Sequence, residues 1–220
     1  MNRARTLWRR FVDRFRPVPA GSRLHIGCGD KRLAGWINMD MAALPGVDIV
    51  ADVTRGLPYS RVDAIYAEHF LEHLAIDDAV KFLGAAHGAL APGAWLRLST
   101  PNLDWVWATH YRLDGDAPEK CLLALRTNRA FRAWGHQFLW NRELLGEALE
   151  ACGFADLRWC AYGESELPVF ANVERHETYE DSASLPHVLI VEAQKADAQP
   201  ERLARLNATI AEQLLAHLAG

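Results

Sequence analysis

The chain has 220 residues, half of them hydrophobic and about a quarter charged, which is typical of one soluble globular domain. No apolar stretch approaches the roughly 20 residues of a membrane span, and no apolar signal-peptide core is present, so we expect a cytoplasmic protein. The net charge is −4, and the absence of a basic stripe outside residues 1–20 argues against a nucleic-acid partner. The four cysteines show neither a CxxC pair nor zinc spacing, so no metal centre is predicted.

Residues 1–20 differ from the rest of the chain because they hold six arginines and one aspartate. Residues 3–16 predict a basic amphipathic helix that Pro17 and Pro19 end. We expect this helix to cover the core of the domain. The alternative is peripheral membrane contact, with the apolar face among lipid headgroups and the arginines on anionic lipid. The apolar face consists of Leu7, Trp8, Phe11, Val12 and Phe15.

Short apolar runs that follow predict buried parallel strands at 24–26, 36–39, 47–50 and 62–66. A helix is predicted over 77–91, with Asp77 or Asp78 as its N-cap, and Pro92-Gly93 is expected to end it before a strand at 94–99. Only about eight and about seven residues separate the first three strands, fewer than a helical crossover needs. We therefore predict an α/β fold whose first crossovers are reduced to loops.

The second half of the chain begins with residues 101–140, an aromatic-rich insertion with four of the eight tryptophans. A helix is then predicted over 141–152, beginning at Asn141 and ending at Gly153. Strands are expected at 155–161 and 187–193, on either side of an acidic loop. An amphipathic helix over 200–218 either packs on its own domain or pairs in a homodimer.

The most informative motif is the glycine turn Gly27-Cys28-Gly29, which follows the first strand. Glycine lets the backbone take a positive φ and approach a ligand closely. Asp40, at the end of the next strand, is placed to accept hydrogen bonds from a ribose. A dinucleotide GxGxxG loop would have a third glycine at Arg32, so the turn indicates a different nucleoside ligand.

Five segments in order resemble the class I S-adenosylmethionine-dependent methyltransferases, and within them a compact group often associated with cell-envelope glycan genes. The resemblance implies a Rossmann-like, seven-stranded, mostly parallel sheet, with a domain over 21–195 and a substrate-side insertion at 101–140. Residues 196–220 then form a separate C-terminal segment that holds the amphipathic helix. The segments are Leu24–Gly29, Trp36–Asp40, Val47–Asp52, Val62–Leu74, and Leu90–Gly93 running into Leu98–Asn102.

The resemblance also implies S-adenosylmethionine as cofactor and assigns roles to matched positions. Gly27 and Gly29 would lie under the methionine part, Asp40 would bind the ribose hydroxyls, and Asp52 with Val53 would face the adenine. Asp52 as a loop acid and Asp40 as a helix cap are the alternative interpretations. The full set of expected cofactor-binding residues is Gly27, Cys28, Gly29, Asp40, Met41, Asp52, Val53, Glu68, His69 and Phe70.

For catalysis we expect methyl transfer to a hydroxyl of a sugar, glycan precursor or other small acceptor, with a histidine removing the proton. His69 and His136 are the candidate bases, with His110 and His176 as weaker ones, and His73 is expected to support the loop. The insertion should overhang the cofactor and bind the acceptor through Trp105, Trp107, Tyr111 and Trp140, unless these aromatics form a local core. The alternatives are a catalytically inactive cofactor-binding module and an NAD(P)-dependent oxidoreductase.

Overall fold

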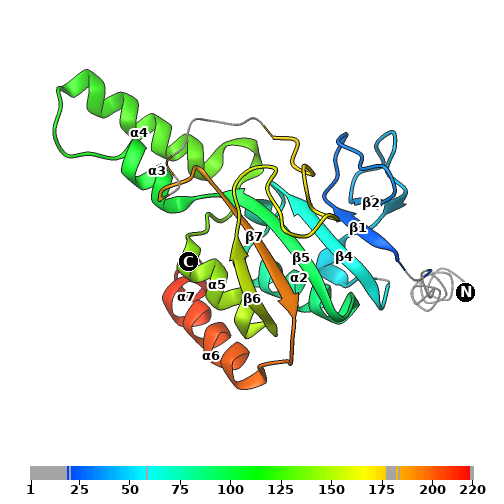
Figure 1. Cartoon of the computed structure of the whole chain (residues 1–220). Coiled ribbons are helices and arrows are strands. Elements are labelled where there is room, and N and C mark those ends of the chain that lie inside the picture. Colours follow the sequence, from blue (N-terminus) through cyan, green and yellow to red (C-terminus); the bar gives the residue numbers. More distant parts are fainter. Residues whose placement is uncertain (1–18, 20, 58, 177–181, 183, 219–220) are drawn as a thin grey trace, which may run out of the picture.

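The computed structural model describes residues 19, 21–57, 59–176, 182 and 184–218 (Figure 1). The helix predicted over residues 3–16 lies outside this part of the chain. None of the described helices is long and apolar enough to cross a membrane.

A seven-stranded sheet forms the centre of the molecule, with strand order β3-β2-β1-β4-β5-β7-β6. The neighbours from β3 to β5 are parallel, whereas β7 is antiparallel to both β5 and β6. The predicted fold class is confirmed. The strands are β1 (Arg23–Ile26), β2 (Ile37–Asp40), β3 (Ile49–Val50), β4 (Val62–Glu68), β5 (Leu90–Pro101), β6 (Phe154–Trp159) and β7 (Val188–Lys195).

The first crossovers are loops, as the short spacing predicts, because neither 27–36 nor 41–48 contains a helix. The turn after β1 stays close to the sheet, since the Cys28 amide donates to the Met39 carbonyl at 3.1 Å. A single 3₁₀ turn, η1 (Val53–Arg55), follows β3. The carboxyl ends of β1, β2 and β4 therefore meet at one edge of the sheet without a long helix above them.

Three helices cover one face of the sheet: α2 (Ile76–Ala89), α5 (Arg142–Ala151) and α6 (Pro200–Ile210). Asn141 caps α5 by accepting from the Leu144 amide, as predicted. In α6 the buried Leu206 and Ile210 belong to the main core, so the apolar side of the C-terminal helix packs on its own domain. A π-helical turn, η4 (Ala211–Leu215), and α7 (Ala216–Leu218) follow α6.

The boundary between α2 and β5 differs from the sequence prediction. Helix α2 begins one residue earlier than predicted, with Ala75 as N-cap, and both predicted caps instead pair with Lys81 inside the first turns. Strand β5 already begins at Leu90 and contains Pro92-Gly93. Gly93, at φ +72°, lies where the pairing with β4 shifts register, so this dipeptide forms an irregularity within the strand.

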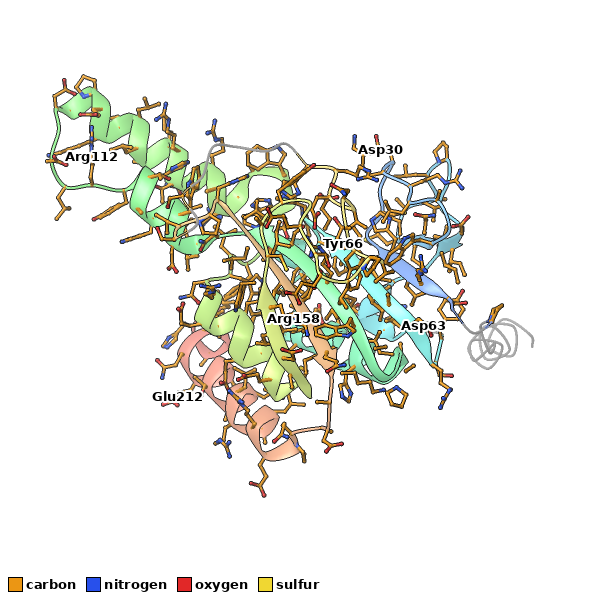
Figure 2. All side chains as sticks on the ribbon, in the orientation of Figure 1. Asp30, Asp63, Tyr66, Arg112, Arg158 and Glu212 are labelled. Carbon is orange, nitrogen blue, oxygen red and sulfur yellow. The ribbon has the colours of Figure 1, made fainter. Side chains whose placement is uncertain are left out.

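The 101–140 segment forms a helical arm, α3 (Leu103–His110) followed by α4 (Ala117–Arg132), which projects from the body on the side away from β1 and β2 (Figure 1). Arg112 lies near its outer end (Figure 2). Helix α4 has no buried residue, so the arm has almost no core of its own.

A loop spanning 163–176 covers the face opposite the helices, where Phe170 and Val173 pack with Trp36 and Tyr66 (Figures 1 and 2). Buried Arg97 on β5 fastens this loop. Its Nε donates to Glu174 at 2.6 Å, its Nη1 to Glu192 on β7 at 2.5 Å, and its Nη2 to the Glu164 carbonyl at 3.0 Å. The pKa of Arg97 is raised, because its carboxylate partners outweigh the effect of burial.

We expect Arg97→Met to lower the free energy of unfolding by about 3–5 kcal/mol, because it leaves two buried carboxylates without a cation. Lys81→Met is the matched control, since Lys81 pairs with Asp77 and Asp78 on an exposed surface. Its loss should leave the free energy of unfolding nearly unchanged, because solvent screens exposed ion pairs. Urea denaturation measures both, and equal losses in the two variants would contradict the role of the buried network.

Candidate functional site

A cavity of about 300 Å³ lies at the carboxyl ends of β1, β2 and β4. In open α/β sheets this edge is where ligands bind. Most of the residues predicted to bind the cofactor come together here. The cavity is lined by Gly27, Asp40, Met41, Asp52, Val53, His69 and Phe70, among others.

The glycine turn and Asp40 form one hydrogen-bonded unit. Gly27 and Gly29 have φ angles of +63° and +50°, and the Gly29 amide donates to Asp40 Oδ2 at 2.9 Å. Asp40 Oδ1 accepts from the Ala42 amide at 2.8 Å. An ionised carboxylate has about four acceptor positions, so two stay available for a diol. The arrangement thus fits a ribose held between the turn and Asp40.

Asp52 has a structural role in addition to any ligand contact. It is the N-cap of η1, and its Oδ1 accepts from the Thr54 hydroxyl at 2.6 Å and from the Thr54 amide at 3.1 Å. The hydrogen bond from the Thr54 hydroxyl is the main reason that the pKa of Asp52 is lowered. Of the two acids, Asp52 is therefore the helix cap, and its contact with the adenine stays a prediction.

Three residues predicted to contact the cofactor, Cys28, Gly29 and Glu68, do not line this cavity. Cys28 is buried, and burial raises the pKa of its thiol to about 11, so it is not a reactive thiolate. Glu68 Oε1 instead accepts from the Arg175 amide at 2.7 Å, the His176 amide at 2.8 Å and His176 Nδ1 at 2.5 Å. Although burial raises the pKa of Glu68, these hydrogen bonds hold it at about 2. The prediction for Glu68 is thus corrected: its side chain fastens the 163–176 loop.

His69 lines the cavity and is held in a strained backbone conformation, with φ +45°. Its Nδ1 lies 2.8 Å from Oε1 of Glu72, whose side chain is fully buried. The Thr100 hydroxyl donates to Oε2 of the same carboxylate at 3.0 Å. Burial lowers the pKa of His69, but the hydrogen bond and charge of Glu72 outweigh it and raise the pKa overall. Sequence reasoning missed this role of Glu72, although its i, i+3 spacing from His69 is a visible signal.

A second cavity, of about 590 Å³, is lined by residues of β6, β7 and the segment that follows β5. It is lined by Asn102, Arg142, Trp159, Tyr162 and His176, among others. The ring of His176 contacts that of His69, with centroids 4.7 Å apart. His69 therefore stands between the two cavities.

The predicted acceptor-binding aromatics do not line either cavity. Trp107 and Tyr111 stack on each other on the exposed arm, Trp105 contacts His110 and His187, and Trp140 is fully buried in the core. The 300 Å³ cavity takes no residue from 101–140, and the arm of α3 and α4 does not overhang it; of this insertion, His136 comes next to the cavity through its ring contact with His73. The arm projects because α3 and α4 pack mainly on each other, a tertiary outcome that aromatic content does not predict.

Three further residues, His136, His25 and Lys31, do not line either cavity. The ring of His136 contacts that of His73, with centroids 5.2 Å apart. His25 is buried in β1, and its Nδ1 lies 3.1 Å from Oδ1 of Asn38. Lys31 lies beside Asp30 on the surface and does not reach the cavity.

Residues 1–158 match the family model described as "Methyltransferase domain". The chain belongs to this methyltransferase family. No curated protein matches at a significant level.

Among solved structures, the chain is similar to an S-adenosylmethionine-dependent methyltransferase from Archaeoglobus fulgidus, with 17% identity, 87% of this chain and 93% of that chain covered, and a TM-score of 0.50. A second one, from Mesorhizobium loti, has 17% identity, coverage of 86% and 97%, and a TM-score of 0.51. A third, from Thermotoga maritima, has 14% identity, coverage of 81% and 84%, and a TM-score of 0.53. At these identities the likeness concerns the fold, that of the class I S-adenosylmethionine-dependent methyltransferases.

S-adenosylmethionine is accordingly the cofactor of this methyltransferase, and the 300 Å³ cavity fits it. The backbone of Gly27 forms part of the cavity wall, the carboxylate of Asp40 keeps free acceptor positions, and Phe70 also lines the cavity. A Cβ at Gly27 would lie 2.6 Å from Cδ2 of Phe70, so this wall has no room for a larger residue.

We expect Gly27→Ala to weaken S-adenosylhomocysteine binding at least about tenfold, because Phe70 must shift into the cavity that the ligand occupies. Gly35→Ala is the matched control, since Gly35 also has a positive φ but nothing within 4 Å of an added Cβ. Both variants should lose about 1–2 kcal/mol of stability through backbone strain. Calorimetric titration of both proteins is the measurement, and unchanged affinity in Gly27→Ala would place the ligand elsewhere.

Proposed function

We propose that this methyltransferase methylates a hydroxyl of a sugar or glycan precursor, with His69 as the general base. The observation that carries the proposal is the position of His69: it lines the cofactor cavity and contacts His176, which lines the second cavity. An acceptor bound in the second cavity would then lie next to His69, with its hydroxyl directed toward the methyl group of the cofactor in the first cavity.

The hydrogen bond to Glu72 supports the role of His69. With Nδ1 donating to the buried carboxylate, the lone pair is on Nε2, the nitrogen that can take a proton from the acceptor. The same bond fixes the ring orientation, as a carboxylate does in other histidine dyads. When bound, the cofactor supplies an electrophilic methyl group on its sulfonium. The protein's own contribution is to align the acceptor oxygen and accept its proton.

The second cavity suits a hydroxylated acceptor. Asn102 donates to the Pro186 carbonyl and accepts from the Asp104 amide, and the Tyr162 hydroxyl donates to the Glu174 carbonyl, so each side chain keeps further hydrogen-bonding positions for a ligand. The guanidinium of Arg142 lies 4.6 Å from the ring centre of Trp159. Aromatic faces combined with amide and guanidinium donors suit the apolar face and hydroxyls of a sugar. These lining residues, rather than the aromatics of the arm, support a glycan acceptor.

The acceptor class is tested by incubating the protein with S-adenosylmethionine and a panel of sugars, nucleotide sugars, amines and phenols. We expect S-adenosylhomocysteine to form with a sugar, and the product to be heavier by one methylene unit in mass spectrometry. Cofactor binding without turnover across the panel would favour the inactive module, and turnover with amines alone would overturn the proposal.

His69→Ala should lower kcat by about 10²–10⁴, the usual effect of losing a general base, while S-adenosylhomocysteine binding changes little. Added imidazole should restore part of the rate. His217→Ala, on an exposed turn of α7, is the histidine control and should behave as the parent does. An equal loss of cofactor affinity and rate in His69→Ala, with no rescue by imidazole, would assign His69 to binding instead.

A further inference from the structure

Beside the cofactor cavity, three side chains that can ligate a metal come together: Glu72, His73 and His136. One ligand atom from each lies within 4.8 Å of the others. Glu72 and His73 belong to the 3₁₀ turn η2 (Leu71–His73), whereas His136 follows η3 (Ala133–Gly135) after the arm. We propose that this cluster binds a divalent transition-metal ion.

The two segments are fastened together by hydrogen bonds outside regular secondary structure. The amides of Gln137 and Phe138 donate to the Glu72 carbonyl at 2.8 and 3.2 Å, and Gln137 Nε2 donates to the His73 carbonyl at 2.5 Å. The chain turns sharply before His136, with φ +58° at Trp134. Such strain in a non-glycine residue is typical of functional sites. The contact between His73 and His136 is therefore built into the backbone.

His136 is oriented as a metal ligand usually is. Its Nδ1 lies 2.8 Å from the Ala130 carbonyl oxygen, which can only accept a hydrogen bond. Nδ1 thus carries the proton, and Nε2 keeps its lone pair. Ligating histidines in proteins characteristically donate their second ring nitrogen to a carbonyl or carboxylate in this way.

Glu72 supplies the negative charge. Its side chain is fully buried, and in the described part of the chain no lysine or arginine pairs with it. Its carboxylate accepts one hydrogen bond on each oxygen, from His69 and Thr100, which leaves one acceptor direction on each. A buried carboxylate is costly without a cation, so a metal ion would stabilise this arrangement.

The donor set selects the kind of ion. Two imidazoles and one carboxylate suit Mn²⁺, Fe²⁺, Co²⁺ or Zn²⁺, whereas Mg²⁺ and Ca²⁺ prefer oxygen ligands. Metal–ligand bonds measure about 2.0–2.2 Å, so small rotations of the half-buried histidine rings suffice to close the set. Three protein ligands leave open positions on the ion. His73 lines the cofactor cavity, so these positions would serve an acceptor oxygen there.

Metal binding is tested on the full chain, purified without a polyhistidine tag and stripped with EDTA. Titration with Zn²⁺ or Mn²⁺ alone should show one ion per chain, and elemental analysis should confirm it. His73→Ala and His136→Ala should each weaken binding at least about tenfold. His110→Ala, which removes a histidine of the arm outside the cluster, should bind as the parent does.

Circular dichroism and the midpoint of thermal unfolding serve as the folding check for each variant, because His73 itself lines the cofactor cavity. No saturable binding of either ion to the parent chain, or equal binding to His73→Ala, His136→Ala and His110→Ala, would overturn the metal site.

The catalytic role of the ion, unlike its binding, rests on the proposed hydroxyl methylation. Stripping with EDTA should lower the transfer rate at least about tenfold and leave S-adenosylhomocysteine affinity unchanged, and returning the ion should restore the rate. An unchanged rate after stripping would overturn the catalytic role. Stoichiometric metal binding together with no transfer to any hydroxyl acceptor would uphold the site and overturn the proposed function.

Discussion

The site depends on one buried carboxylate, that of Glu72. Its side chain joins His69 to Thr100, and therefore joins the turn after β4 to the end of β5. Its carbonyl holds the segment that returns from the arm. Because the carboxylate is fully buried, losing either hydrogen-bond partner would leave charge without compensation in a medium of low dielectric. The position of His69, at a positive φ, follows from this constraint.

Two further acids organise the surroundings in a similar way. Asp40 ties the glycine turn to the end of β2, and Glu68 ties the 163–176 loop to the end of β4. All three acids follow or end parallel strands, so their bonds gather at one edge of the sheet. Arg97 fixes the same end of the loop through Glu174 and its beginning through the Glu164 carbonyl. The edge is thus closed by short polar contacts where longer helical crossovers are absent.

Much of this architecture is predictable from the sequence, because it follows from local patterns. The apolar runs predict the strands, the short spacings predict the loop crossovers, and Gly27, Gly29 and Asp40 predict the cavity for the nucleoside. The role of Glu68 is not predictable in this way, since it depends on His176, 108 residues away. That of Glu72 is visible only in part, because its bond to His69 is local whereas Thr100 lies 28 residues away. The acceptor-binding role expected for the aromatic residues of 101–140 also depends on long-range contacts. The number of aromatic residues does not predict whether α3 and α4 fold over the cavity or away from it.

We propose that the cofactor lies between the glycine turn and Asp40 with its reactive end toward His69. A crystal structure of the chain with S-adenosylhomocysteine tests it directly. We predict the ribose hydroxyls within hydrogen-bonding distance of Asp40, the sulfur facing His69, and the second cavity open on the far side of that histidine. A ligand in the second cavity, or a ribose bound without Asp40, would contradict the account.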